Sequence, residues 1–198
     1  MSAAVENGVD WLQLRERDLE AREWLAWARE LAARAMPRAS VIVNRRVDIA
    51  LVLGAGGVHL GFDAMTPQDA AGLLPHGSEI GVSTHAPEEV RRAREAGASY
   101  AHLAPIWSPI SKPPERPAMG ASGLGAACAQ GIPVLAQGGL TPERCGEALA
   151  AGAAGIAVTG DILLADDPGA AAARLRAALD QAARDQASLD QAARDATS

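Results

Sequence analysis

PVLAQGGLTP, at residues 133–142, is the segment of this sequence that points most clearly to a fold. It reads as a short apolar strand that ends in a glycine pair and is followed at once by a helix start. A second strand end of this kind closes GIAVTG, at residues 155–160. Glycine lets a backbone approach a ligand, and the next helix turns its N–H groups toward it. We therefore expect a phosphate site at Gly138, Gly139, Thr159 and Gly160; the alternative is two ordinary strand-to-helix turns.

Short apolar strands alternate with helices along the rest of the chain. We expect strands at residues 9–14, 41–43, 57–60, 80–83, 100–104, 133–136 and 155–158. Strict alternation of this kind predicts a parallel sheet and the α/β class. Two glycine-ended strands late in such a chain favour a TIM (β/α)8-type barrel. With seven strand–helix units, the sequence as given would lack the first strand of that barrel.

The end of the chain differs from the rest. LDQAARD occurs at residues 179–185 and again at 189–195. A spacing of ten residues at about 100° each leaves the two copies about 80° out of phase on a helix, so they build no common apolar seam. We predict a barrel domain over residues 1–178 and an extended, polar, solvated helix or tail over residues 179–198.

Composition limits the classes of partner. The formal net charge of the 198 residues is −6, which argues against nucleic acid as a partner. There is no run of eighteen apolar residues and no signal peptide, so we expect a cytoplasmic protein without a membrane partner. Cys128 and Cys145 lack the spacing of metal ligands. Whether the chain forms a homo-oligomer stays open.

Candidate chemistry gathers where strands end, because catalytic groups of these barrels lie at the carboxyl face. Arg15 and Arg17 follow the first strand and offer forked donors to a phosphate or diphosphate, unless they form a solvated loop. Asn44 ends the second strand. His85 follows the strand that holds Ser83 and is placed for proton transfer near neutral pH; its alternative is a polar loop residue.

Two further features complete the set. The proline-rich loop at residues 105–117 is a candidate rim segment, in which Ser111 offers a hydroxyl and Lys112 a charge to a phosphate. His59 lies within an apolar strand, and we expect a hydrogen-bonded core histidine there.

In this order, the segments resemble the thiamin phosphate synthase/TenI family over residues 9–168. The pieces are QLRERD, VNRRVDIAL, GVHLG, IGVSTH, APIWSPISK, PVLAQGGLTPE and AGAAGIAVTGDIL. The resemblance implies a (β/α)8 barrel that acts on precursors of thiamin. One branch joins hydroxymethylpyrimidine diphosphate to thiazole phosphate with Mg2+, and the TenI branch aromatises a thiazole carboxylate phosphate by moving a proton.

The metal positions favour the TenI branch. The family's synthases place a metal-binding Asp after the Asn, where this chain has Arg45, and a second Asp at the position of Ala64, next to Asp63. We therefore expect a TenI-like thiazole tautomerase, with His85 as the catalytic residue and with Arg15, Arg17, Asn44, Ser83, Ser111 and Lys112 as substrate-binding residues. No metal or cofactor is expected. The alternatives are thiamin phosphate synthase, which would bring Mg2+, and a non-catalytic protein that binds a phosphorylated ligand.

Overall fold

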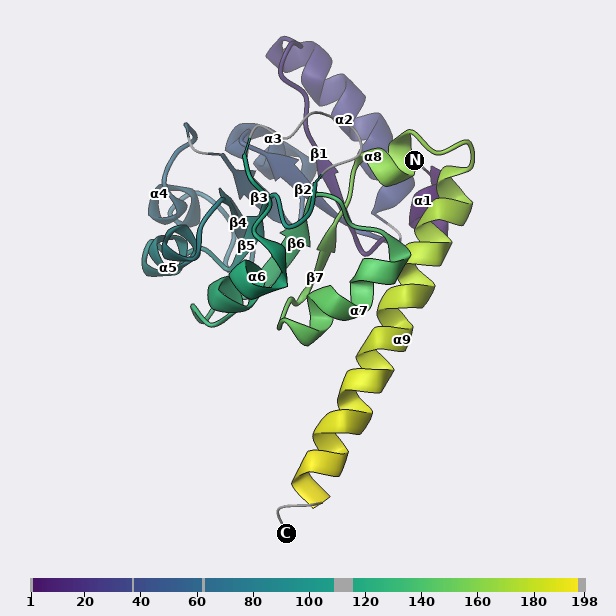
Figure 1. The fold of residues 1–198 in the computed structure, drawn as a ribbon. Helices are drawn as coiled ribbons and strands as arrows, with labels where there is room; N and C mark the ends of the chain where they lie inside the picture. Colours follow the sequence, from purple (N-terminus) through teal and green to yellow (C-terminus); the bar gives the residue numbers. More distant parts are fainter. Residues whose placement is uncertain (1, 37, 62, 109–115, 196–198) are drawn as a thin grey trace.

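One parallel sheet forms the centre of the molecule. The computed structural model describes residues 2–36, 38–61, 63–108 and 116–195. Its strands are β1 (Trp11–Leu14), β2 (Ser40–Asn44), β3 (Gly57–Leu60), β4 (Glu79–Thr84), β5 (Tyr100–Leu103), β6 (Val134–Gln137) and β7 (Gly155–Ala157). All seven are parallel and follow one another in chain order, so the sheet curls as a barrel wall (Figure 1). The predicted seven-stranded TIM-type fold is confirmed; within the described residues no ladder joins β7 to β1.

Helices surround this sheet. They are α1 (Ser2–Glu6), α2 (Ala21–Ala35), α3 (Val47–Leu53), α4 (Pro67–Ala71), α5 (Pro87–Glu95), α6 (Gly120–Cys128), α7 (Pro142–Ala150), α8 (Gly160–Leu163) and α9 (Pro168–Asp195). Their starts follow local chemistry. Pro87 stands in the first turn of α5 with two glutamates, which suit the positive end of the helix dipole. Thr66 caps α4, because its hydroxyl accepts a hydrogen bond from the backbone N–H of Asp69 at 3.2 Å.

Alternation along the strands divides the core from the barrel interior. Val41 and Val43 of β2 are fully buried in a cluster with Trp24 of α2, between the sheet and the outer helices. The residues between and after them, Ile42 and Asn44, have the opposite direction in the strand. β2 therefore presents one apolar face to the helices and its other face to the barrel interior.

The last helix, α9, is 28 residues long, and its two halves differ in burial. Its first half is buried through Ala172 and Leu175 against Ala4 of α1 and Cys145 of α7. Beyond Asp180 its residues are mostly exposed, and the helix projects away from the barrel (Figure 1). The helix runs through residues 178 and 179 without a break, and the domain division placed there stays a prediction. In the part of the chain that the structure describes, no helix has both the length and the apolar character to cross a membrane.

The first strand is shorter than residues 9–14. Asp10 lies before β1, where its backbone oxygen accepts from the N–H of Ser40 at 2.8 Å and its carboxylate pairs with Arg176 of α9 at 2.7 Å. Val9 packs into the cluster beneath α9. The start of the predicted strand is therefore used to tie the N-terminal segment to the last helix.

Candidate functional site

The predicted site residues in the described part of the chain lie at one edge of the sheet, because all strands are parallel. Arg15 directly follows β1, Asn44 ends β2 and Ser83 lies near the end of β4. The glycine pair follows β6, and Thr159 comes shortly after β7. Ser111 and Lys112 lie outside the described residues. The sequence thus places its candidate groups around one rim, and their roles stay predictions.

A positively charged arc lies over β1 and β2. Leu14 pairs with Val43, so Arg15 comes next to Asn44. Burial lowers the pKa of Arg15, and the charges of Arg17 and Arg45 lower it further, which shows that three guanidinium groups gather here. Asn44 is buried, and its side-chain amide donates to the backbone oxygen of His59 at 3.2 Å.

Inside the barrel a polar chain leads from the core to the rim. His59 is 1% exposed; its Nδ1 lies 3.2 Å from the hydroxyl of Tyr100, and its Nε2 lies 2.9 Å from the hydroxyl of Ser83. Burial lowers the pKa of His59 to about 2, and the nearby charges of His102 and Arg15 add to this effect. The predicted core histidine is confirmed, and it also holds a predicted substrate-binding hydroxyl.

Tyr100 and His102 also belong to this polar cluster inside the barrel, and the sequence analysis did not identify them as contributors to the site. The rings of His59 and His102 lie 4.2 Å apart between centroids, and Tyr100 packs against both. Burial lowers the pKa of His102 to about 4. A signal was present, because polar residues recur in otherwise apolar strands that pair as neighbours. Such residues gather in a barrel interior.

His85 lies on the rim and is exposed. Its Nδ1 donates to the backbone oxygen of Ala104 at 2.6 Å, since a carbonyl oxygen can only accept. Its backbone N–H donates to the carboxylate of Glu89 at 2.7 Å. A neutral ring held in this way carries its lone pair on Nε2. The geometry fixes the ring's tautomer and leaves its proposed role in catalysis untested.

Backbone conformation and close packing also require glycine at positions 138 and 139, apart from any ligand. Gln137 pairs with Ala157, so the ends of β6 and β7 are adjacent as predicted. Gly138 and Gly139 have φ values of 95° and 62°, in the left-handed region that favours glycine. A Cβ on Gly139 would come 2.5 Å from the backbone oxygen of Ser108. The loop after β5 therefore already requires a glycine here, whatever binds at the rim.

Arg144 is a further candidate that the sequence analysis missed. From the first turn of α7, its Nη1 donates to the backbone oxygen of Gly139 at 2.5 Å. Its guanidinium carbon lies 5.3 Å from the centre of the Trp107 ring. Arg144 thus braces the glycine turn against the loop and brings a positive charge to the predicted phosphate site. A basic residue in the first turn after a glycine pair was the available signal.

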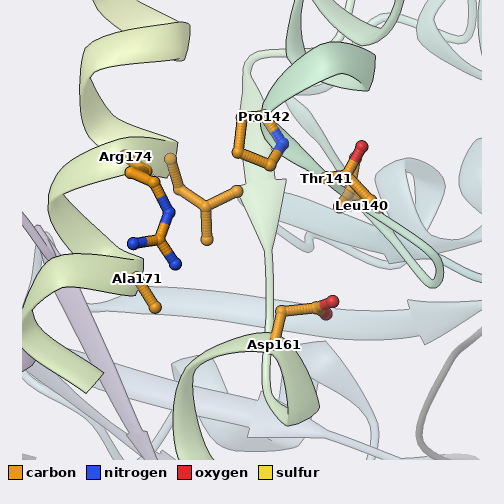
Figure 2. A pocket seen from close by; sticks show the side chains of 7 residues that line it. Leu140, Thr141, Pro142, Asp161, Ala171 and Arg174 are labelled. Carbon is orange, nitrogen blue, oxygen red and sulfur yellow. The ribbon is translucent and has the colours of Figure 1, made fainter. Parts of the chain in front are cut away.

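A small cavity of about 160 Å3 lies between the start of α7, α8 and α9. Figure 2 shows its lining, in which the charged side chains of Asp161 and Arg174 border the space together with apolar residues. None of the predicted site residues lines it, although Leu140 and Asp161 directly follow Gly139 and Gly160 in sequence. Among the described residues, no three His, Cys, Asp or Glu side chains come together as a metal site.

Comparison with known proteins places this rim in a family. The family model described as thiamine monophosphate synthase matches residues 1–162. Thiamine-phosphate synthase of Albidiferax ferrireducens is 38% identical over 91% of this chain and 83% of that protein. The enzyme of the same name from Thermus thermophilus is 40% identical over 87% of this chain and 84% of that protein. A solved structure, thiamine phosphate pyrophosphorylase from Pyrococcus furiosus, superposes with a TM-score of 0.82 at 29% identity, over 91% of this chain and 88% of that one.

These relatives correct the functional expectation. They carry the name of the synthase, so the TenI-like tautomerase expected from the substituted metal positions is wrong, and the synthase alternative is the better supported one. The residues at positions 45 and 64 did not indicate the branch. By its sequence over most of its length and by its fold, the chain belongs to the thiamine monophosphate synthase family.

Proposed function

We propose that this protein is a thiamine-phosphate synthase and so an enzyme of thiamin biosynthesis. The observation that carries the proposal is the identity of 34–40% to proteins of that name over most of the chain. The reaction joins two phosphorylated small molecules. The thiazole nitrogen bonds to the methylene carbon of the pyrimidine, the bond from that carbon to the diphosphate oxygen breaks, and pyrophosphate leaves with the electron pair.

The rim offers a place for each anionic end. We assign the diphosphate of the pyrimidine to the arc of Arg15, Arg17 and Asn44 over β1 and β2. We assign the phosphate of the thiazole to the strand ends after β6 and β7, where Gly138 and Gly139 adjoin Thr159 and Arg144 supplies charge. The arc over β1 and β2 is separated from the turns after β6 and β7 by the strands between them. Ser83 of β4, held by His59, lies between these two places and suits the ring systems of the substrates.

The resemblance to synthases implies Mg2+ at the diphosphate, and the residues present do not fit that ion. A divalent cation of this type needs several free oxygen ligands. Here Arg45 occupies the position after Asn44, and its Nη1 lies 2.6 Å from the Oδ1 of Asp63. The Arg45 side chain stands in one ligand position and pairs with the nearby carboxylate, so these residues do not suit a divalent cation.

Complementation tests the function. We expect the gene to restore growth without thiamin to a bacterial strain that lacks its synthase. An Arg15→Ala variant should fail, because it removes a charge from the diphosphate arc, whereas Arg22→Ala on the exposed face of α2 should succeed at equal expression. Failure of the parent protein to complement, while soluble and expressed, would contradict the proposal.

A further inference from the structure

The turn after β2 holds Arg45 in an unusual backbone conformation. Its φ is 65°, and it is the only residue other than glycine with a positive φ among the described residues. The backbone N–H of Arg45 donates to the oxygen of His59 at 2.9 Å, and the N–H of Arg46 donates to the oxygen of Asn44 at 2.8 Å. This conformation is unfavourable for a non-glycine residue, and such strain concentrates at functional sites. The turn thus fixes where the Arg45 side chain leaves the rim.

Asp63 holds the other end of that side chain. The Nη1 of Arg45 lies 2.6 Å from its Oδ1, and Arg45 is the main cause that lowers the pKa of Asp63. The carboxylate of Glu16, in the loop after β1, accepts from the backbone N–H groups of Arg17 and Asp18 at 2.6 and 2.9 Å. Both carboxylates near the arc therefore already have donors of the protein itself.

The arc keeps an excess of positive charge. Arg15 and Arg17 form no ion pair with another described residue, and Asp63 pairs with Arg45 alone. Arg15, Arg17 and Arg45 thus lie at the ends of two adjacent strands, and among the described residues only Arg45 of the three pairs with a carboxylate. A diphosphate carries several negative charges, and guanidinium groups bind phosphate oxygens through paired, charge-assisted hydrogen bonds.

We propose that Arg45, fixed by its turn and by Asp63, replaces a divalent cation, so that Arg15, Arg17 and Arg45 together bind the diphosphate of the substrate without metal. This inference rests on the proposed synthase function. Asp63 pairs with Arg45 and partly neutralises its charge, and it is not a metal ligand. The pyrophosphate product binds to the same three side chains.

Binding of inorganic pyrophosphate measured by calorimetry tests the site directly. We expect the parent protein to bind pyrophosphate in EDTA. Arg45→Gln should weaken this binding about 10- to 100-fold, the usual effect of losing one charge-assisted contact. Arg46→Gln is the matched control, because the neighbouring Arg46 is already paired with Asp48 through two bonds of 2.8 and 2.6 Å; it should change binding less than about threefold.

Asp63→Asn distinguishes a metal-free site from a site in which Asp63 is a metal ligand. Asp63 is exposed, so we expect the variant to fold as the parent does. If Asp63 restrains Arg45, its loss should leave pyrophosphate binding in EDTA equal or tighter. If Asp63 is a metal ligand, its loss should weaken binding in Mg2+. Arg45→Asp should convert the site: we expect loss of binding in EDTA and a new Mn2+ signal by electron paramagnetic resonance, absent in the parent.

The outcomes separate the site from the function. Pyrophosphate binding by the parent that requires Mg2+ and vanishes in EDTA would overturn the metal-free site, even if thiamin phosphate is formed. Unchanged binding by Arg45→Gln, with circular dichroism that shows a folded protein, would also overturn it. Absence of thiamin phosphate from both substrates would instead refute the synthase function, while binding in EDTA would still support the anion site.

Discussion

At the residue scale, the two buried histidines, His59 and His102, make the free energy of unfolding depend on pH. Burial lowers the pKa of His59 to about 2 and that of His102 to about 4, so both rings stay neutral in the folded protein near neutral pH. In the unfolded chain each would titrate near pH 6.5. Below that pH the unfolded state binds more protons than the folded state, and stability must fall as pH falls.

We therefore predict that the free energy of unfolding decreases between pH 7 and pH 5 by about 2 kcal/mol for each of these histidines. The His59→Gln variant should lose about 2 kcal/mol less over the same interval than the parent, whatever its stability at pH 7. Urea unfolding at the two pH values measures both differences. An equal pH dependence of parent and variant would show that His59 can be protonated within the fold.

Gly139 gives a second prediction at this scale, since its positive φ and the nearby Ser108 backbone both exclude a side chain. Gly139→Ala should lower the free energy of unfolding by about 1–3 kcal/mol. Gly146→Ala, within α7 where a Cβ meets open space, should raise it by about 0.5–1 kcal/mol. Thermal unfolding of both variants measures the contrast, and a Gly139→Ala protein as stable as the parent would refute the close packing.

Residue types and their place in the chain were enough to predict the rim but not its contacts. Arg15 and Asn44 could be placed because both stand at strand ends. The hydrogen bond between His59 and Ser83 could not be predicted, because it joins two neighbouring strands whose register does not follow from the sequence. Arg45 was recognised as a departure from the family pattern, yet its pairing with Asp63 depends on the course of the next loop.

At the element scale, the two halves of α9 differ in what they contribute. Leu175 is 5% exposed in the cluster that joins α9 to α1 and α7, whereas Leu189 is 65% exposed. The repeat of LDQAARD predicted a solvated end, and the described residues beyond Asp180 are mostly exposed; the division of the chain at residue 179 stays a prediction. The role of the first half was not predictable from the repeat, since it depends on packing against the N-terminal helix.

We predict that Leu175→Ala lowers the free energy of unfolding by about 2–4 kcal/mol, because it removes buried apolar contacts. Leu189→Ala should change it by no more than about 0.5 kcal/mol. Urea unfolding of the two variants beside the parent makes the comparison. Similar losses in both would mean that the distal half of α9 packs against something in solution.

The positions of the strands could be predicted from local sequence patterns. Apolar runs of four or five residues between glycine and proline gave β3 its full extent and most other strands within about two residues. The start of β1 was misplaced, because Asp10 serves a contact with α9 rather than the sheet. Local pattern thus determines which segments are strands, and tertiary contacts determine where they stop.

At the scale of the whole molecule, parallel strands collect charged and polar side chains from distant parts of the chain at one rim. This arrangement places a cationic arc over β1 and β2 and the glycine turns over β6 and β7. The proposed synthase function assigns one anionic substrate to each of these two places. The branch within the family was not predictable from the metal positions, because the same loss of carboxylates is compatible with a synthase that handles diphosphate through arginines.

Phosphorus NMR of the purified protein with hydroxymethylpyrimidine diphosphate and thiazole phosphate is the decisive test of the synthase function. We predict that thiamin phosphate and pyrophosphate appear together in equal amounts, and that neither forms when one substrate is left out. Because one C–N bond forms for each diphosphate released, the ratio follows from the reaction itself. No product from both substrates, or pyrophosphate released without thiamin phosphate, would contradict the claim that this protein is a synthase.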